Sequence, residues 1–288
     1  MTDNPPTQFR LHPRTHDENR FVYPVLSRRS RGISIGVNLN PDKICNFDCI
    51  YCQIDRRSEA ETQFVETDRL ITELDSMIRF VVSGEIYLDD KFADIPEALR
   101  RLNDIAFSGD GEPTTYRNFD EIVENAVAIR RQHELVEPKT VLITNASMFH
   151  RPAVQRGLDI LDENNGEIWA KLDAGTEAYY QTIERTKIPF SQILENISAA
   201  ARIRPLVIQS LFMRVEGEGP PNSEINAYCD RLNEIIAAGG QLKTVQVYTV
   251  ARQPAEHYVT SLSDGQLDAI ADQIREQTDL TAEVFGSS

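Results

Sequence analysis

Hydrophobic residues follow two different spacings along most of this 288-residue chain. Short runs that are apolar throughout predict strands buried on both faces, and runs with apolar residues three or four positions apart predict helices. The predicted strands are residues 33–39, 104–109, 139–145, 167–174, 206–215 and 242–250. The predicted helices are residues 68–84, 118–132, 152–163, 195–203, 223–240 and 264–277.

The order of these elements predicts the class of fold. Six strands are each followed by a helical stretch, and such alternation is typical of a parallel sheet covered by helices. Six units are fewer than the eight of a closed barrel, so an open or partial barrel and a doubly wound sheet both fit. The pattern predicts an α/β domain over residues 33–288. Residues 1–32, with four prolines and no sustained period, are interpreted as an N-terminal extension.

Polar and unusual residues follow the predicted strands. In both architectures the site lies at the carboxyl ends of parallel strands. The stretch KICNFDCIYCQ follows the first strand and SGDGEPT follows the second. The third and fourth strands end in TNAS and KLDAG, and QPAEH lies just past the last strand. We therefore expect these loops to contribute to one site.

Composition and charge exclude some classes of protein. The 30 basic and 45 acidic residues give a net charge of −15, which counts against a broad nucleic-acid-binding surface. No apolar run approaches the roughly 18 residues of a membrane span, and the first residues lack an apolar signal segment. We therefore expect a cytoplasmic protein with no membrane partner. In that compartment clustered cysteines favour metal binding or catalysis over disulfides.

Three of the four cysteines, Cys45, Cys49 and Cys52, lie within eight positions. A structural zinc site needs four ligands, usually as two separated pairs, and a dithiol redox centre would leave Cys45 unexplained. A cubane iron–sulfur cluster is the third interpretation, because thiolates hold its irons. Three thiolates would leave one iron without a protein ligand and free to coordinate a substrate or cofactor.

The spacing C-x-x-x-C-x-x-C, with Tyr51 before the last cysteine, resembles the signature of the radical S-adenosylmethionine (SAM) superfamily. The resemblance spans residues 33–255 and implies a partial (β/α)6 TIM-like barrel of parallel strands. It also implies a 4Fe-4S cluster held by Cys45, Cys49 and Cys52. In this family the reduced cluster cleaves SAM to a 5′-deoxyadenosyl radical, which abstracts hydrogen from a substrate. An external electron donor similar to flavodoxin or ferredoxin is implied as a partner.

The same resemblance implies contacts to SAM or substrate at the other strand ends. Lys171 and Asp173 lie two apart on a predicted strand, so both side chains point the same way. Lys171 could pair with the SAM carboxylate, and Asp173 could bind the ribose or orient Lys171; a structural ion pair is the alternative. The other candidates are Tyr51, Gly109, Gly111, Glu112, Asn145, Gln209, Tyr248 and Val250. A helix cap is an alternative for Asn145, a tight turn for the glycine loop, and core packing for Gln209, Tyr248 and Val250.

Within the superfamily, the stretches FSGDGEPT, KLDAG and VQVYTVAR resemble iron–sulfur oxidoreductase-like proteins related to the wyosine tRNA-modifying synthases. Those synthases carry an upstream cysteine set, whereas no cysteine precedes Cys45 here. Three functions are therefore kept open. The first is a radical SAM enzyme of unknown substrate. The second is a tRNA-base-modifying enzyme, which the acidic charge disfavours. The third is a non-catalytic binding protein stabilised by zinc or a cluster.

Overall fold

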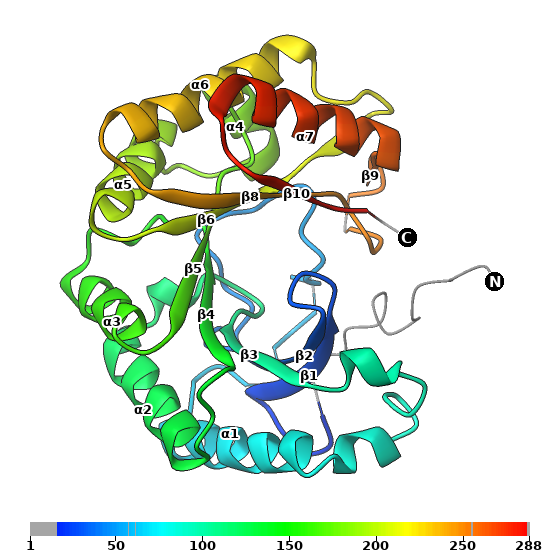
Figure 1. Ribbon diagram of the computed structural model, residues 1–288, viewed down its shortest axis with the longest axis vertical. Helices are drawn as coiled ribbons and strands as arrows, with labels where there is room; N and C mark the ends of the chain where they lie inside the picture. Colours follow the sequence, from blue (N-terminus) through cyan, green and yellow to red (C-terminus); the bar gives the residue numbers. More distant parts are fainter. Residues whose placement is uncertain (1–15, 57, 61, 255, 287–288) are drawn as a thin grey trace. The chain divides into compact units, whose positions relative to one another are not determined.

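The computed structural model describes residues 16–56, 58–60, 62–254 and 256–286 (Figure 1). The chain divides into two compact units. Unit 1 holds the described residues up to Ile44, together with those of Arg56–Ile143 and Arg151–Glu167. Unit 2 holds Cys45–Asp55, Thr144–His150 and the described residues from Ile168 onward. None of the described helices is long and apolar enough to cross a bilayer.

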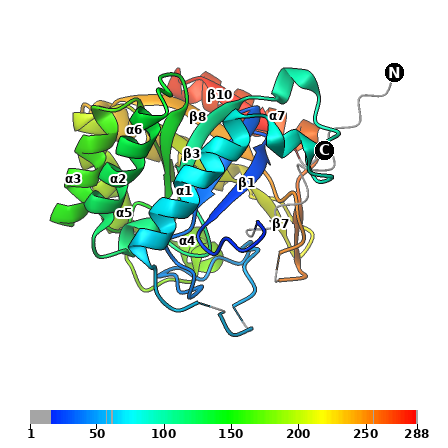
Figure 2. The same cartoon turned by 90° about the horizontal axis from the view of Figure 1, so that it is seen from below.

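Unit 1 is a layer of strands packed against helices. Its strands lie in the order β1 (Val22–Ser27), β2 (Gly32–Val37), β3 (Leu102–Phe107) and β4 (Lys139–Thr144). The last three are parallel, and β1 is antiparallel to β2. Helix α1 (Thr67–Val82) packs on β1 and β2, and α2 (Phe119–Gln132) packs on α1 and on α3 (Pro152–Asp162) (Figures 1 and 2). The short 3-10 helices are Glu85–Leu88, Glu97–Leu99 and Pro113–Thr115.

Strand β1 lies inside the region that the sequence assigned to an N-terminal extension. Pro24 interrupts its pattern, and proline inside an apolar run is expected only on an edge strand. The buried carboxylate of Glu73 on α1 fastens the start of this strand. It accepts hydrogen bonds from the backbone N–H groups of Arg20 (3.0 Å), Phe21 (2.8 Å) and Val22 (3.2 Å). Residues 1–15 of the expected extension lie outside the described residues.

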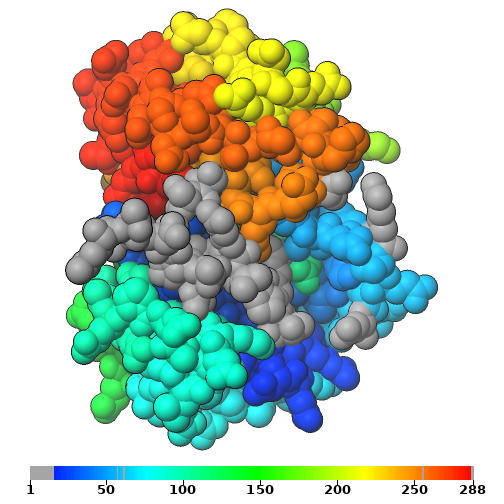
Figure 3. Space-filling view, turned by 90° about the vertical axis from the view of Figure 1, so that its right-hand side faces the viewer, coloured from blue at the N-terminus to red at the C-terminus, as the bar shows by residue number. Residues whose placement is uncertain are grey.

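Unit 2 repeats the same arrangement with four parallel strands. Their order is β5 (Gly166–Lys171, from Ile168), β6 (Leu206–Leu211), β8 (Leu242–Tyr248) and β10 (Ala282–Phe285). The helices are α4 (Glu177–Glu184), α5 (Phe190–Ile203), α6 (Asn222–Ala237) and α7 (Asp264–Thr278). Helix α5 packs on α6, α6 packs on α7, and α7 packs on β8 and β10. Figure 3 shows the segment that carries α7, in orange to red, at the surface.

Four differences from the predicted elements have physical causes. The strand predicted over residues 206–215 breaks at Phe212, because Met213–Val215 (β7) leaves the sheet and pairs with Val259–Ser261 (β9). Helix α4 and strand β10 were not predicted, since eight and four residues are too short to show a clear period. The helical stretch that residues 195–203 were predicted to close has its last helix from Phe190, directly after Pro189. The other predicted strands and helices are confirmed to within a few residues.

Gly175 sets the distance between the end of β5 and helix α6. An added Cβ would lie 2.1 Å from the backbone nitrogen of Tyr228, and the neighbour is main chain that cannot turn away. We therefore expect Gly175→Ala to lower the free energy of unfolding by about 1–3 kcal/mol or more, measured by urea denaturation. Gly265→Ala is the matched control, because a Cβ added there would meet nothing within 4 Å and alanine favours a helix. Equal stability of the two variants would contradict this account of Gly175.

Candidate functional site

The cysteine loop, Cys45–Asp55, belongs to unit 2 and is fastened to the end of α4. The backbone N–H of Asp48 donates to the carbonyl of Glu184 (3.1 Å), and that of Ile50 donates to the carbonyl of Ile183 (2.9 Å). The last carbonyls of a helix have no partner within the helix. The cysteine loop donates hydrogen bonds to two of these carbonyls, so the end of α4 fixes the position of the loop backbone.

The three cysteine residues of this loop are partly exposed, and none forms a disulfide. The apolar residues between them, Phe47 and Ile50, are buried and anchor the loop. Among the described residues no three His, Cys, Asp or Glu side chains converge as they would around one metal ion. A zinc site needs four donors around one point, whereas a cubane spreads its thiolates over different irons. The three thiols of this loop can thus serve as ligands to three different irons of such a cluster.

Glu184 is a buried carboxyl group beside this loop that sequence reasoning missed. The Cys49 thiol donates to its Oε2 at 2.6 Å, and the Tyr51 hydroxyl lies 3.3 Å from its Oε1. Burial, and then Asp173, raise the pKa of Glu184 to about 8, against the lowering effect of Lys171. Burial and Glu184 likewise raise the pKa of the Cys49 thiol. The one sequence signal was weak: an acid in the last turn of a helix opposes the macrodipole.

Lys171 and Asp173 form an ion pair, which the sequence left open as the alternative to contacts with SAM. The Lys171 ammonium lies 2.9 Å from Asp173 Oδ2, which also accepts a hydrogen bond from the Tyr51 hydroxyl at 2.5 Å. The other oxygen, Oδ1, accepts from the backbone N–H of Leu211 (2.7 Å). Burial disfavours the ammonium, but Asp173 and neighbouring groups outweigh it and raise the pKa of Lys171. The Lys171 ammonium is therefore protonated at neutral pH.

Two glutamines and a tyrosine extend this group across neighbouring strands. Lys171 Nζ lies 2.8 Å from the Tyr248 hydroxyl, which lies 3.4 Å from Gln209 Oε1. Gln209 Nε2 donates to Gln246 Oε1 at 3.0 Å. The strand register explains the row, because Gln209 pairs with both Lys171 and Gln246. Gln246 was not predicted from sequence, since only the register places it beside Gln209. We call the set the strand-end polar cluster: Tyr51, Lys171, Asp173, Glu184, Gln209, Gln246 and Tyr248.

Asn145 and Val250 have simpler surroundings in unit 2. The Asn145 side chain accepts hydrogen bonds from the backbone N–H (3.1 Å) and hydroxyl (2.6 Å) of Ser147. It also donates to Asn46 Oδ1 in the cysteine loop at 2.9 Å. Asn145 therefore shapes a turn and braces the loop. Val250 is buried as core packing would have it.

The glycine loop SGDGEPT lies in unit 1. An added Cβ on Gly109 would lie 2.3 Å from Asn38 Oδ1, and one on Gly111 would lie 2.3 Å from the carbonyl oxygen of Ile44. Both glycines are therefore required by close packing within the unit. Glu112 is buried and accepts hydrogen bonds from the backbone N–H (3.1 Å) and hydroxyl (2.5 Å) of Thr114. It thus caps the turn that follows.

The family model of the radical SAM superfamily matches residues 39–222, which is more than half of the chain. The chain belongs to the radical SAM superfamily. Membership confirms the prediction made from the cysteine spacing. It implies an enzyme, and it supports the use of SAM.

Two relatives of this radical SAM protein carry only a family designation as their description. The UPF0026 protein of Helicobacter pylori strain J99 is 25% identical over 85% of this chain and 70% of its own length. The UPF0026 protein of Methanocaldococcus jannaschii is 29% identical over 61% of this chain and 48% of its own length. These relatives extend the family without naming a reaction.

A solved structure with bound S-adenosylmethionine shares the fold of this radical SAM protein. Streptococcus suis SuiB, solved with S-adenosylmethionine, has a TM-score of 0.55 at 10% identity and covers 91% of this chain and 49% of its own. Archaeal TYW1 has a TM-score of 0.47 at 17% identity and covers 86% and 73%. The likeness to SuiB confirms the predicted class, an α/β partial barrel of mostly parallel strands, for this radical SAM protein.

Proposed function

We propose that this chain is a radical SAM enzyme whose 4Fe-4S cluster is held by Cys45, Cys49 and Cys52. The cysteine loop carries the proposal, because it presents three closely spaced, partly exposed cysteines on a backbone fixed by buried neighbours. When bound, the cluster would supply the electron that cleaves SAM to a 5′-deoxyadenosyl radical for hydrogen abstraction from a substrate. A cytoplasmic enzyme with a flavodoxin- or ferredoxin-like electron donor is part of the same proposal.

The strand-end polar cluster would bind the cofactor beside this loop in unit 2. Lys171 carries a positive charge that can pair with the SAM carboxylate, and its side chain keeps 17% of its surface exposed. Asp173 orients Lys171 and can bind the ribose. The Tyr51 hydroxyl donates to Asp173. Tyr51 therefore links the cysteine loop to the Lys171–Asp173 ion pair.

The remaining polar residues would contact SAM or the substrate. Gln209 and Tyr248 offer donors and acceptors beside Lys171. Asn145 and Val250, also in unit 2, complete the proposed set of SAM contacts in that unit, and Gly109, Gly111 and Glu112 of unit 1 stay contacts predicted from the sequence. The chemistry of these side chains suits a polar ligand, and the substrate itself is not identified by them.

Anaerobic reconstitution with iron and sulfide tests the proposal. We expect about four irons per chain and broad visible absorbance, because three thiolates can hold a cubane. Addition of dithionite and SAM should then release 5′-deoxyadenosine, detected by chromatography. One zinc per chain without visible absorbance would instead select a non-catalytic, metal-stabilised binding protein.

A further inference from the structure

Arg185, the residue after α4, joins the cysteine loop to a second loop of unit 2. Its Nε donates to the backbone carbonyl of Asp48 (2.7 Å), and a terminal nitrogen pairs with the Asp48 carboxylate (3.1 Å). The other terminal nitrogen pairs with Glu256 Oε1 at 2.7 Å. All three guanidinium nitrogens are therefore engaged, and two of them hold the residue that immediately precedes Cys49.

The second loop follows β8 and touches the cysteine loop at another point. Glu256 lies in this loop, and the carbonyl of Arg252 accepts a hydrogen bond from Gln53 Nε2 (3.2 Å). Gln53 directly follows Cys52, as Asp48 directly precedes Cys49. The loop after β8 thus holds the cysteine loop on both sides of its C-x-x-C pair, once through Arg185 and once directly.

Backbone conformation makes arginine an unexpected residue at this position. Arg185 closes α4 with a φ of 44°, in the left-handed region. Glycine is the usual residue there, because a side chain costs about 1–2 kcal/mol in this conformation. The side chain is 35% exposed and Asp48 is 60% exposed, and ion pairs this open contribute little to stability. Stability alone therefore does not account for an arginine here.

We propose that Arg185 is a positioning residue for the cluster ligands, with Glu256 as its anchor. The guanidinium fixes the carbonyl and carboxylate of Asp48, and so sets the backbone that presents Cys49 and Cys52. The proposal rests on the proposed function, since the group to be held is the iron–sulfur cluster. A loop preset in this way assembles the cluster faster and releases it more slowly than a loop free to move.

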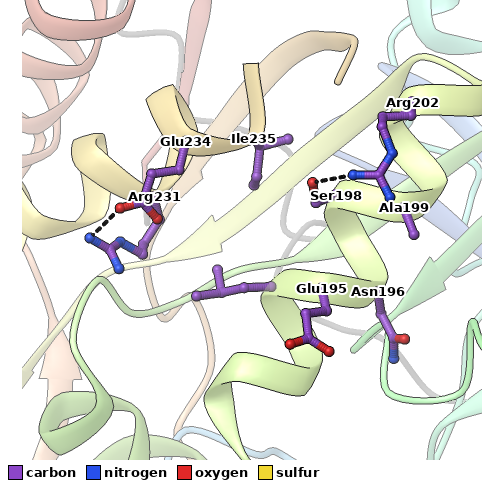
Figure 4. A pocket seen from close by; sticks show the side chains of 9 residues that line it. Glu195, Asn196, Ser198, Ala199, Arg202, Arg231, Glu234 and Ile235 are labelled. Carbon is purple, nitrogen blue, oxygen red and sulfur yellow. Dashed lines mark hydrogen bonds and ion pairs between the residues drawn. The ribbon is translucent and has the colours of Figure 1, made fainter. Parts of the chain in front are cut away.

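The decisive variant is Arg185→Gly, which keeps the left-handed turn and removes the guanidinium. Arg185→Lys keeps one positive charge but can serve only one of its two partners. Arg202→Gln is the matched control: Arg202 lines a pocket of about 550 Å³ between α5 and α6, and its guanidinium donates to Ser198 (Figure 4). Stability is measured by urea denaturation of the protein without its cluster.

Two readouts follow the loop itself. One is the rate at which each cysteine of the cluster-free protein reacts with iodoacetamide, measured by mass spectrometry. The other is the anaerobic rate of iron loss to a chelator after reconstitution. For Arg185→Gly we expect unchanged or higher stability and faster alkylation of Cys49 and Cys52. Iron loss should be about tenfold faster, because the charge-assisted hydrogen bonds that hold Asp48 are lost. Arg185→Lys should fall between Arg185→Gly and the wild type, and Arg202→Gln should match the wild type.

The outcomes separate this inference from the proposed function. If Arg185→Gly shows the same alkylation and iron-loss rates as the wild type, the positioning role is overturned, and the proposed enzyme function is unaffected. Failure of the wild type to hold iron would overturn the proposed function, and the alkylation rates would still test the loop. If Arg185→Gly does not fold, Glu256→Gln decides, because it removes the anchor without changing the turn. It should accelerate alkylation and iron loss in the same direction, and unchanged rates would overturn the proposal.

Discussion

Cys49→Ala is expected to abolish both iron binding and SAM cleavage. Cys49 is the central thiol of the cysteine loop, and alanine leaves two ligands for a cubane that needs at least three from the protein. Iron after anaerobic reconstitution should fall from about four per chain toward zero, and 5′-deoxyadenosine should fall to the level of a mixture without protein. Iron analysis and chromatography measure the two effects.

Cys229→Ala is the control for this loss. Cys229 is fully buried in α6, away from the cysteine loop in sequence, and burial raises the pKa of its thiol. We expect normal iron content and a stability loss of about 1 kcal/mol, as for removal of a small buried group. Full cluster assembly and turnover in Cys49→Ala would show that the loop is not the cluster site.

Asp173→Ala is expected to produce the largest loss of stability among single substitutions in the strand-end polar cluster. Asp173 accepts hydrogen bonds from the Tyr51 hydroxyl and the Leu211 backbone N–H, and it forms an ion pair with Lys171. Alanine would leave the buried Lys171 ammonium without its counter-charge, which costs about 3–5 kcal/mol. Urea denaturation at pH 7 measures the loss, and SAM affinity should fall with it under the proposed function.

The sign of the pH dependence identifies the cause of this loss. In the wild type the pKa of Lys171 is raised above its ordinary 10.5, so its contribution to stability is full below that pH and declines above it. In Asp173→Ala burial would instead lower the Lys171 pKa, so the unfolded chain would bind the extra proton and stability would rise with pH. The difference between variant and wild type should therefore shrink as the pH approaches about 10.

The double variant Asp173→Ala/Lys171→Met provides the control for charge. Removing both members of a buried ion pair is often close to neutral, whereas removing one is costly. We expect the double variant to recover most of the stability lost in Asp173→Ala. A double variant as unstable as the single variant would show that the lost Leu211 and Tyr51 contacts, rather than the stranded ammonium, carry the effect.

The parts of the fold that sequence predicted are those with long, uniform patterns. The continuous apolar runs of β2, β3, β4 and β8 and the helical periods of α1, α2 and α7 each marked an element close to its observed bounds. Strand β1 was not predicted because Pro24 interrupts its apolar run. The start of this strand is held by the carboxylate of Glu73, which lies far away in the sequence. Contacts of this kind join segments far apart in the chain, so no local pattern reveals them.

The site shows the same division between local and distant information. The cysteine spacing is local, and so is the two-residue spacing that pairs Lys171 with Asp173. Glu184 and Gln246 were missed because their positions depend on the chain folding back and on strand register. Asn145 and Glu112 were predicted as ligand contacts; both accept hydrogen bonds within local turns, and Asn145 also donates to Asn46 in the cysteine loop.

The attachment of the cysteine loop to the end of α4 also constrains how this protein can diverge. Two backbone hydrogen bonds tie the loop to Ile183 and Glu184, and Thr186 donates to the carbonyl of Asn46 (2.9 Å). A change of this helix by even one residue would rotate each of these hydrogen-bonding groups away from the cysteine loop. The cysteine loop and the helix end therefore have to change together to keep these contacts, although more than a hundred residues of chain separate them.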